Sequence, residues 1–427
     1  MSLHIANARL IDPATDMDIM GGLLIDGDQI FDLGEHLLKP GSAAERVLDA
    51  QGACLAPGLI DLRVKTGEPG EEHRETLATA SRAAVAGGIT SMVVMPDTSP
   101  VIDDMALVQF ISNQGEKTAL NRVYPAGALS TGLQGKAMSE LGLMANAGAV
   151  FFTNGDSPIT NAGVLKRAMT YAAGRDMIVS SRPDEAQLSG HGVMNAGALA
   201  AQKGLKGITA EAELIGLQRD IALAEATGCH LLVDNISTAQ SVDVIKRAKA
   251  SGVKITVTIA AYSLFFNEID VGDYLTYCKV NPPFRSETDR LALIEAVADG
   301  TIDIVTSAHD PQPPENKRLP FGEASFGAAG LETLLSTLLA LVQDEQLSLL
   351  EALRPLTSAP GQLLGLEQGT LRKGAPADLI LFNPNKPWHC KREELLSRSV
   401  NSPYDGRRMV GQVSRTFVGG REVHRRT

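Results

Sequence analysis

Two cationic side chains, Arg63 and Lys65, stand two residues apart where the apolar run 59–64 ends. Residues two apart on a strand point the same way, so both are expected to face one site. Both are cations near neutral pH, and neither offers a lone pair to a divalent metal. A divalent ion about 4 Å from one such charge would be repelled by roughly 8 kcal/mol at an effective dielectric near 20. The pair predicts a site without a bound cofactor, zinc included.

Inward-pointing cations need counter-charges, because an unpaired buried charge is costly. Four acids near predicted strand ends are the candidates: Asp97, Asp156, Asp184 and Asp310. We predict that they form an internal ion-pair network with Arg63 and Lys65. The alternative is an anion-binding, ligand-sensing pocket built from Arg63, Lys65 and Arg182.

Few other side chains are placed for acid–base or nucleophilic chemistry. His309 follows the last apolar run and, with Asp184 or Asp310, is the available base, although we expect it to be a packed remnant. The other histidines show no His-x-His or His-x-x-x-His spacing. No C-x-x-C pair occurs among the cysteines, which predicts buried thiols in a reducing compartment: Cys54, Cys229, Cys278 and Cys390.

Parallel strands alternating with helices would position these residues. Apolar, β-rich runs separated by helix-length intervals occupy residues 59–64, 90–95, 122–128, 149–153, 177–181, 230–236, 254–260 and 303–308. Eight such runs predict an α/β fold, a (β/α)8 TIM-type barrel. Helical spacing is clearest at 75–86, 240–250 and 331–342.

Both chain ends have short alternating segments closed by turns, which predict one small antiparallel β domain. The expected division is 1–57 and 365–427 for the two parts of this composite β domain, with the barrel at 58–364. The Pro-rich segment 311–320 is an irregular loop after the eighth strand, at the functional end of a barrel.

Bulk composition narrows the class of partner. The 427 residues carry 39 Lys plus Arg against 50 Asp plus Glu, a net charge of −11. That balance argues against nucleic-acid and membrane-surface partners. Without a signal-like start or a long apolar run, the expected location is cytoplasmic.

Several motifs, in order along the chain, carry a family resemblance. They are Pro57-Gly58-Leu59-Ile60-Asp61, the Gly-Gly-x-Thr…Met-Pro-Asp-Thr segment 87–98, and the segments 207–213, 279–286 and 326–333. Together they resemble the type I dihydroorotases of the amidohydrolase superfamily over nearly the whole chain. The resemblance implies the superfamily's barrel with a small β domain.

The same resemblance implies that the family's usual metal and catalytic groups are replaced. The replaced metal or acid–base positions are Arg63, Lys65, Asn154, Gly155, Ser181, Asn235 and Ala308. The replaced substrate positions are Gly67 and Asp97, where the family carries Arg and Asn. Residual pocket positions are His309, Asp184 and Asn281.

From these losses we predict a chain that is not an enzyme. The resemblance then implies a structural subunit needed for assembly and activity of aspartate carbamoyltransferase in pyrimidine biosynthesis. The expected partner is that enzyme's catalytic chain, with this chain a homo-oligomer inside a complex of six copies of each. The alternative is a cyclic-amide hydrolase, of dihydroorotase or hydantoinase type, with a rebuilt site.

Overall fold

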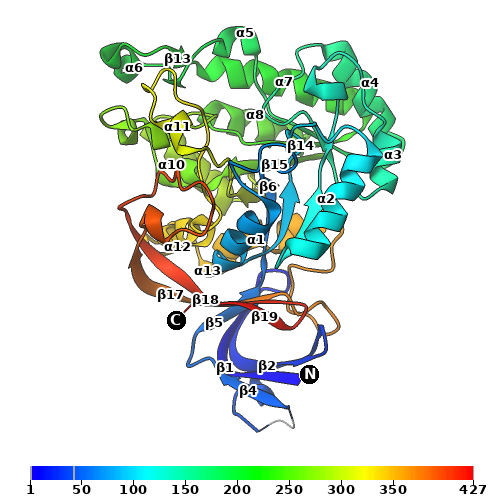
Figure 1. The fold of residues 1–427 in the computed structure, drawn as a ribbon, viewed down its shortest axis with the longest axis vertical. Coiled ribbons are helices and arrows are strands. Elements are labelled where there is room, and N and C mark those ends of the chain that lie inside the picture. The colour runs from blue at the N-terminus through cyan, green and yellow to red at the C-terminus, as the bar shows by residue number, and fades with distance from the viewer. Residues whose placement is uncertain (1, 42–43, 427) are drawn as a thin grey trace.

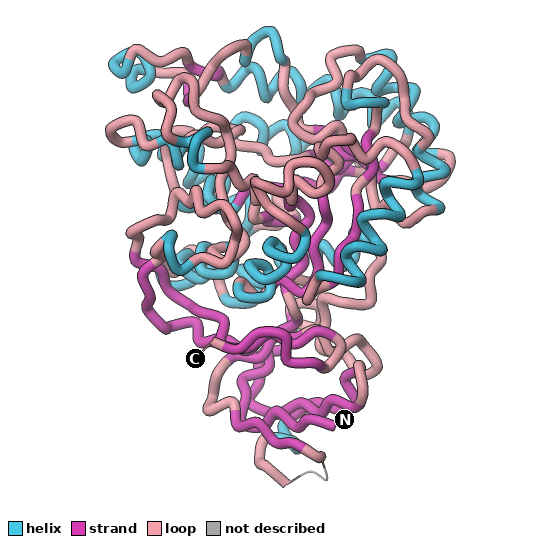
Figure 2. Tube along the Cα trace, viewed as in Figure 1, coloured by secondary structure: helices cyan, strands magenta, loops and turns pink. Residues whose placement is uncertain are grey.

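Both chain ends pair in one sheet at one end of the molecule, and a barrel surrounded by helices lies above it (Figures 1 and 2). The computed structural model describes residues 2–41 and 44–426. The sheet contains β1 (Ser2–Asp12), β2 (Met17–Asp26), β3 (Gln29–Gly34), β4 (Arg46–Asp49), β5 (Cys54–Pro57), β17 (Leu379–His389), β18 (Arg408–Val418) and β19 (Arg421–Arg425). Its order is β19-β18-β17-β5-β1-β2-β3, with β4 paired to β1. The predicted β domain from both ends is therefore confirmed.

The sheet is mixed rather than purely antiparallel, which corrects the prediction. β4 and β5 both run parallel to β1, whereas β17 pairs antiparallel with β5. The chain leaves β3 through the 3-10 turn η1 (Glu35–Leu37) and a crossover, not a hairpin. Only a crossover brings the next strand in with the same direction, and strand patterns alone do not reveal it.

Parallel strands form the barrel, and each predicted run overlaps at least one of them. They are β6 (Leu59–Val64), β7 (Ile89–Val94), β8 (Arg122–Pro125) continued by β9 (Gly127–Ala128), β10 (Phe152–Thr153), β11 (Ile178–Ser181), β14 (His230–Val233), β15 (Ile255–Ala260) and β16 (Ile304–Thr306). The barrel closes where the Lys65 amide donates to the His309 carbonyl oxygen at 2.9 Å. Val, Ile and Leu side chains dominate because these strands are buried on both faces. The predicted barrel is confirmed.

Helices cover the barrel, and side-chain caps set where several of them begin. Thr76 caps α1, Asn161 caps α4 and Ser286 caps α10, each accepting from an otherwise unpaired amide of the first turn. The longer helices are α1 (Leu77–Ala86), α2 (Met105–Thr118), α4 (Ala162–Ala173), α7 (Ala210–Thr227), α8 (Ala239–Ala250), α10 (Glu287–Ala298) and α12 (Leu334–Gln343).

Shorter elements complete the barrel layer. The short helices are α3 (Leu141–Asn146), α5 (Ala186–Ser189), α6 (Ala198–Lys203), α9 (Ala261–Phe265), α11 (Pro314–Lys317), α13 (Leu349–Leu353) and α14 (Ser358–Leu364). The remaining 3-10 turns are η2 (Thr131–Leu133), η3 (Glu268–Val271), η4 (Thr276–Cys278), η5 (Arg354–Leu356) and η6 (Arg392–Glu394). A small pair, β12 (Met194–Asn195) and β13 (Gly207–Ile208), lies outside the barrel.

The composite sheet docks on the barrel through β18 and α12. Gly411 on β18 approaches Leu339 of α12 so closely that a Cβ there would lie 2.1 Å from the leucine Cδ1. The Trp388 indole donates to the Gly411 carbonyl at 3.0 Å, and the Thr416 hydroxyl donates to the Val85 carbonyl of α1 at 2.6 Å. Close backbone approach at this glycine therefore joins the two parts.

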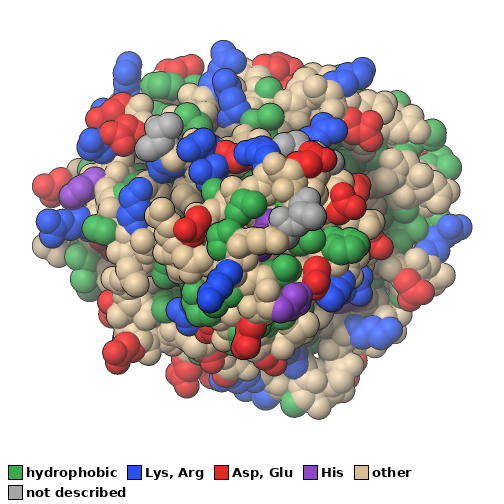
Figure 3. All heavy atoms as spheres, turned by 90° about the horizontal axis from the view of Figure 1, so that it is seen from below, with side chains coloured by type: hydrophobic (Ala, Val, Ile, Leu, Met, Phe, Trp, Pro, Cys, Tyr) green, Lys and Arg blue, Asp and Glu red, His purple; other side chains and the backbone are tan. Residues whose placement is uncertain are grey.

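The face seen from the sheet end mixes basic, acidic and apolar side chains without one continuous patch of either charge (Figure 3). Among residues 2–41 and 44–426, no helix is long and apolar enough to cross a membrane.

All four cysteines are free and buried, and burial raises the pKa of each thiol to between about 11 and about 12.

Candidate functional site

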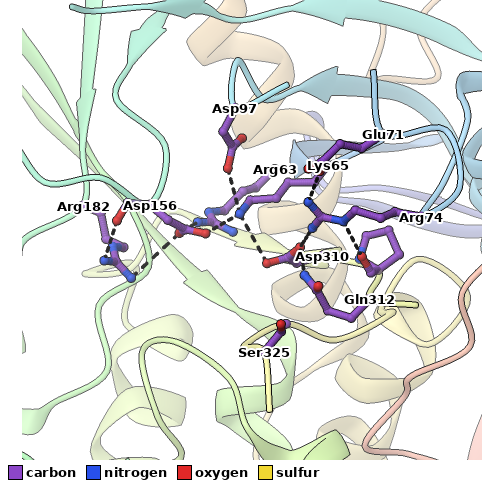
Figure 4. A network of polar contacts seen from close by, with 12 residues as sticks. Arg63, Lys65, Glu71, Arg74, Asp97, Asp156, Arg182, Asp310, Gln312 and Ser325 are labelled. Carbon is purple, nitrogen blue, oxygen red and sulfur yellow. Dashed lines mark hydrogen bonds and ion pairs between the residues drawn. The ribbon is translucent and has the colours of Figure 1, made fainter. Parts of the chain in front are cut away.

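Charged side chains meet at the carboxyl ends of the barrel strands, the end where barrel enzymes carry their active sites (Figure 4). Arg63 is the last but one residue of β6, and Lys65 is the first residue after that strand. Both point into one cluster, as their two-residue spacing predicted. Arg63 is only 3% exposed and Lys65 only 8%, so their partners decide whether the site is stable.

Lys65 is the centre of the cluster. Its Nζ lies 2.8 Å from Asp97 Oδ2 and 3.2 Å from Asp310 Oδ2, and it also donates to Asp156. Three carboxylates around one ammonium satisfy its three donors. The predicted ion-pair network is therefore confirmed at this position, and Figure 4 shows these side chains converging on one another.

Arg63 has one predicted partner and one that sequence reasoning missed. Its Nη2 lies 2.5 Å from Asp156 Oδ1, and its Nε donates to Asp234 Oδ2 at 2.9 Å. Asp234 directly follows β14, and its place at the end of a predicted strand could have signalled it. Asp61, at 0% exposure, instead accepts from the amide and hydroxyl of Ser307 and thereby links β6 to the end of β16.

Two further arginines extend the cluster. Arg74, also missed by the sequence analysis, donates to Asp310 Oδ1 at 2.8 Å and pairs with Glu71. Arg182 donates to the Asp156 carbonyl at 2.9 Å and to Asp184 Oδ2 at 3.5 Å. Each cation of the suggested anion pocket thus already has a carboxylate partner. Arg74 comes from a loop with no strand pattern, so the sequence held no signal for it.

Burial and charge shift the pKa values of the central groups in opposite directions. Burial opposes the charged form of Lys65, but Asp156, Asp310 and Asp97 outweigh it and raise the Lys65 pKa. For Asp156, burial is likewise outweighed by Lys65, Arg63 and Arg182, which hold its pKa well below the ordinary 3.8. The charged forms of Lys65 and Asp156 are therefore both favoured, as expected for an ion pair.

The replaced strand-end positions have structural partners of their own. Asn154 Oδ1 accepts from the Ser130 hydroxyl at 2.7 Å, and the Ser181 hydroxyl donates to Asp220 at 2.7 Å. Asn235 Oδ1 accepts from the Thr306 hydroxyl at 3.3 Å. These three side chains are therefore engaged in packing the strand ends together.

Three other replaced positions are defined by backbone geometry. Ala308 has φ 47° although it is not glycine, which is a strained conformation at the end of the eighth strand. Gly67 has φ +72°, and a Cβ there would lie 2.6 Å from the Glu71 carbonyl oxygen. At Gly155, with φ +57°, a Cβ would lie 3.2 Å from Asp97 Cγ. The chain thus runs too close at Gly67 for any side chain.

The residual pocket residues divide between two places. Asp184 and Asn281 line one small cavity beside Arg182 and Arg285. His309 lies outside it, fully buried, with Nδ1 accepting from the Gly330 amide at 3.3 Å and Nε2 3.6 Å from Glu75 Oε2. The suggested pairing of His309 with Asp184 or Asp310 is therefore not found. Glu75 in turn accepts from Ser397, so the histidine belongs to a packed connection.

Comparisons with known proteins place the chain in a family. The family model described as "Dihydro-orotase-like" matches residues 52–241, and one described as "Amidohydrolase family" matches residues 340–424. The chain is 39% identical over 426 residues to a protein of Pelobacter propionicus named dihydroorotase, covering 100% of both. It is 37% identical to a Wolbachia protein of the same name, covering 98% of this chain and 94% of that one.

Solved structures agree on the fold. An L-hydantoinase (dihydropyrimidinase) from Arthrobacter aurescens superposes with a TM-score of 0.89 at 24% identity, covering 99% of this chain and 96% of that one. A dihydropyrimidinase from Brevibacillus agri gives a TM-score of 0.85 at 21% identity, covering 100% and 95%. At these identities the likeness speaks for the fold alone.

Two predictions are contradicted by these findings. The prediction that the chain is not an enzyme conflicts with relatives 39% identical over its whole length that are named dihydroorotase. The prediction that no cofactor is bound, zinc included, conflicts with dihydroorotases and hydantoinases of this kind being typically zinc-dependent. Both predictions equated replacement of the family's usual side chains with loss of chemistry, which does not follow from the sequence of one chain. On whole-length identity, the chain belongs to the dihydroorotase-like family of amidohydrolases.

Proposed function

We propose that the chain is a cyclic-amide hydrolase whose site is rebuilt around the ion-pair network. The observation that carries the proposal is a cluster of buried, charged side chains at the active end of the barrel, in a chain 39% identical to proteins named dihydroorotase. Preorganised donors and acceptors in a water-poor site are what hydrolysis of an amide requires.

The residues at the family's ligand positions do not fit a zinc ion. Arg63 and Lys65 supply cations, Ala308 supplies a methyl group, and the side chains of Asn154 and Ser181 are engaged elsewhere. In residues 2–41 and 44–426, no three or more His, Cys, Asp or Glu side chains are grouped so that they could hold a metal ion.

Asp97 is the group best placed to handle a proton. Its Oδ2 is held by Lys65, whereas its buried Oδ1 has no hydrogen-bond partner within the described ranges. Asp97 Oδ1 would take a proton from a bound water as the water oxygen attacks the ring carbonyl, and Asp97 would return that proton to the ring nitrogen as the ring C–N bond breaks. The buried Nε of Arg182 also lacks a hydrogen-bond partner among the described residues. It would stabilise the negative charge that develops on the carbonyl oxygen.

Turnover measurements test this function. Purified full-length protein would be assayed with dihydroorotate, dihydrouracil and hydantoin, with its metal content measured and with zinc added or chelated. We expect turnover above background that falls at least about tenfold in Asp97→Asn, because one positioned base typically contributes 10²–10⁴-fold. Absence of turnover for all three rings, with and without zinc, would refute the proposal.

Association with the catalytic chain of aspartate carbamoyltransferase, six copies of each, stays a prediction from the sequence resemblance. Co-expression followed by sizing and activity measurement tests it. Equal assembly and activity of the carbamoyltransferase with and without this chain would count against it.

A further inference from the structure

The segment 390–407 connects β17 to β18, yet it leaves the composite sheet and docks on the barrel. We call this segment the strap. Its residues 391–394 and 405–407 are exposed, as in an ordinary surface connection, whereas Ser397, Ser399 and 401–404 are buried. The buried positions attach the strap to the barrel, so their partners there decide how firmly it is held.

Two carboxylates of the barrel hold the middle of the strap. Glu332, just before α12, accepts from the Leu396 amide at 2.6 Å. Glu75, just before α1, accepts from the Ser397 hydroxyl and from the Arg398 amide at 3.0 Å. Since both acids face the same few residues of the strap, their charge states control its docking.

The next residues of the strap reach the ion-pair network. The Ser399 hydroxyl donates to the Arg74 carbonyl at 2.7 Å, and Asn401 Oδ1 accepts from the Gln312 amide at 2.9 Å. Gln312 Nε2 donates in turn to Asp310 Oδ1 at 2.8 Å (Figure 4). Arg74 and Asp310 are themselves paired at 2.8 Å. The docked strap therefore fixes two members of the network from outside the barrel.

Charged and titratable groups surround Glu332 on each side. Arg426, after β19, attracts its carboxylate, and Glu75 repels it. Cys390, at the start of the strap, is buried and close enough for the Glu332 charge to raise its thiol pKa. His309 lines with Glu332 a cavity of about 10 Å³ under the strap, room for one water, and its buried Nε2 has no hydrogen-bond partner among the described residues.

Burial outweighs these neighbours and makes the ionised form of Glu332 costly. It raises the Glu332 pKa to about 7 from 4.5, so the docked state is favoured below pH 4.5 and loses that advantage as pH rises through 7. A carboxylate released into water returns to the ordinary value. Between pH 5 and pH 7.5 this linkage weakens docking by up to about 50-fold.

We propose that the strap is a pH-sensitive positioning element of the site: docked while Glu332 carries a proton, it fixes Arg74 and Asp310, and it loosens as Glu332 ionises. The contacts that carry the proposal lie between the strap and the barrel. The proposal is therefore independent of which reaction the site performs, and it is tested without a substrate.

Amide hydrogen exchange of the full-length protein at pH 5 and pH 7.5 tests the strap. Each rate is divided by the rate of an unstructured peptide at the same pH, which leaves the local opening equilibrium. We expect the protection of the Leu396, Arg398 and Gln312 amides to fall by about 10- to 50-fold at the higher pH. Amides of β15, inside the barrel, should keep their protection.

Three variants separate the Glu332 charge from other effects. Glu332→Gln keeps an acceptor for the Leu396 amide but cannot ionise, so its strap should be equally protected at both pH values. Glu225→Gln, the same charge change on the exposed face of α7, should behave as the unaltered protein does. Ser397→Ala removes one docking bond, so it should lower protection at both pH values and leave the pH dependence in place.

Each contrary result identifies the step that fails. Strap protection that is the same at pH 5 and pH 7.5 would overturn the proposal, and so would an equal fall in Glu332→Gln. A fall confined to the Leu396 and Arg398 amides, with the Gln312 amide still protected, would overturn the connection between the strap and the ion-pair network.

Discussion

Replacing Lys65 with methionine removes the cation shared by three carboxylates. Asp156 keeps Arg63 and Asp310 keeps Arg74, but Asp97 loses its ion-pair partner. Removing one partner from a buried pair costs about 3–5 kcal/mol, because the remaining charge stays buried and uncompensated. Unfolding entropy of about 2.1 cal/mol/K per residue translates this loss into a Tm decrease of about 3–6 °C for a chain of this length.

The loss should depend on pH. The lowered pKa of Asp156 contributes stability that is present above its ordinary pKa of 3.8 and is lost as pH falls through the folded value. Removing Lys65 removes part of that lowering, so the variant's deficit should be full at pH 7 and smaller at pH 3, below the ordinary pKa of Asp156. Differential scanning calorimetry at both values measures this difference.

A matched surface control separates the buried charge from the substitution itself. Lys246→Met removes a lysine whose partner Asp299 is exposed, as the lysine is. Exposed pairs contribute about 0–1 kcal/mol, so its Tm should change by less than about 1 °C. If Lys65→Met lowered Tm no more than Lys246→Met, the network would not hold the barrel ends together.

Two other substitutions probe groups outside the cluster. Glu332 accepts from the Leu396 amide at 2.6 Å, and burial raises its pKa to about 7 from 4.5, so its charged form costs stability as pH rises through that window. Glu332→Gln should remove up to about 3 kcal/mol of this loss, measured as a flatter dependence of Tm on pH between 4.5 and 7.5; an unchanged slope would contradict it. Gly411→Ala should cost about 1–3 kcal/mol more than Gly406→Ala, because both glycines have φ near +77° but only Gly411 would place a Cβ against Leu339. Equal Tm values for the two alanine variants would mean that the close contact of Gly411 with Leu339 does not limit stability.

The barrel could be predicted because buried parallel strands leave a strong signal. Runs such as 59–64 and 254–260 are apolar on both faces, and the structure has strands at Leu59–Val64 and Ile255–Ala260. A very short strand could be located but its ends could not be predicted: the run 149–153 contains only the two-residue strand Phe152–Thr153. Pairing direction in the terminal sheet was missed because it depends on the path between strands, not on their composition.

The site was predictable where residues sit at strand ends. Arg63 and Lys65 were expected to share a face, and Asp97 and Asp156 to neutralise them, because strand periodicity and strand ends fix both sets of positions. Arg74 escaped prediction, since a loop residue reaches the cluster only through tertiary structure. The activity was misjudged for a different reason: identity of side chains at strand ends does not by itself decide whether a barrel retains chemistry.

The geometry of this network constrains how it could be converted to the family's usual set. Returning a carboxylate to position 308 alone would add an acid to a site where Asp97, Asp156 and Asp310 already share Lys65. Returning an arginine to position 67 would require the backbone near Glu71 to move, because the Cβ itself has no room. Arg63, Lys65 and Asp97 are joined through shared ion pairs, and Gly67 is fixed by backbone contact. Metal-binding or substrate preference should therefore change only when several of these positions are altered together.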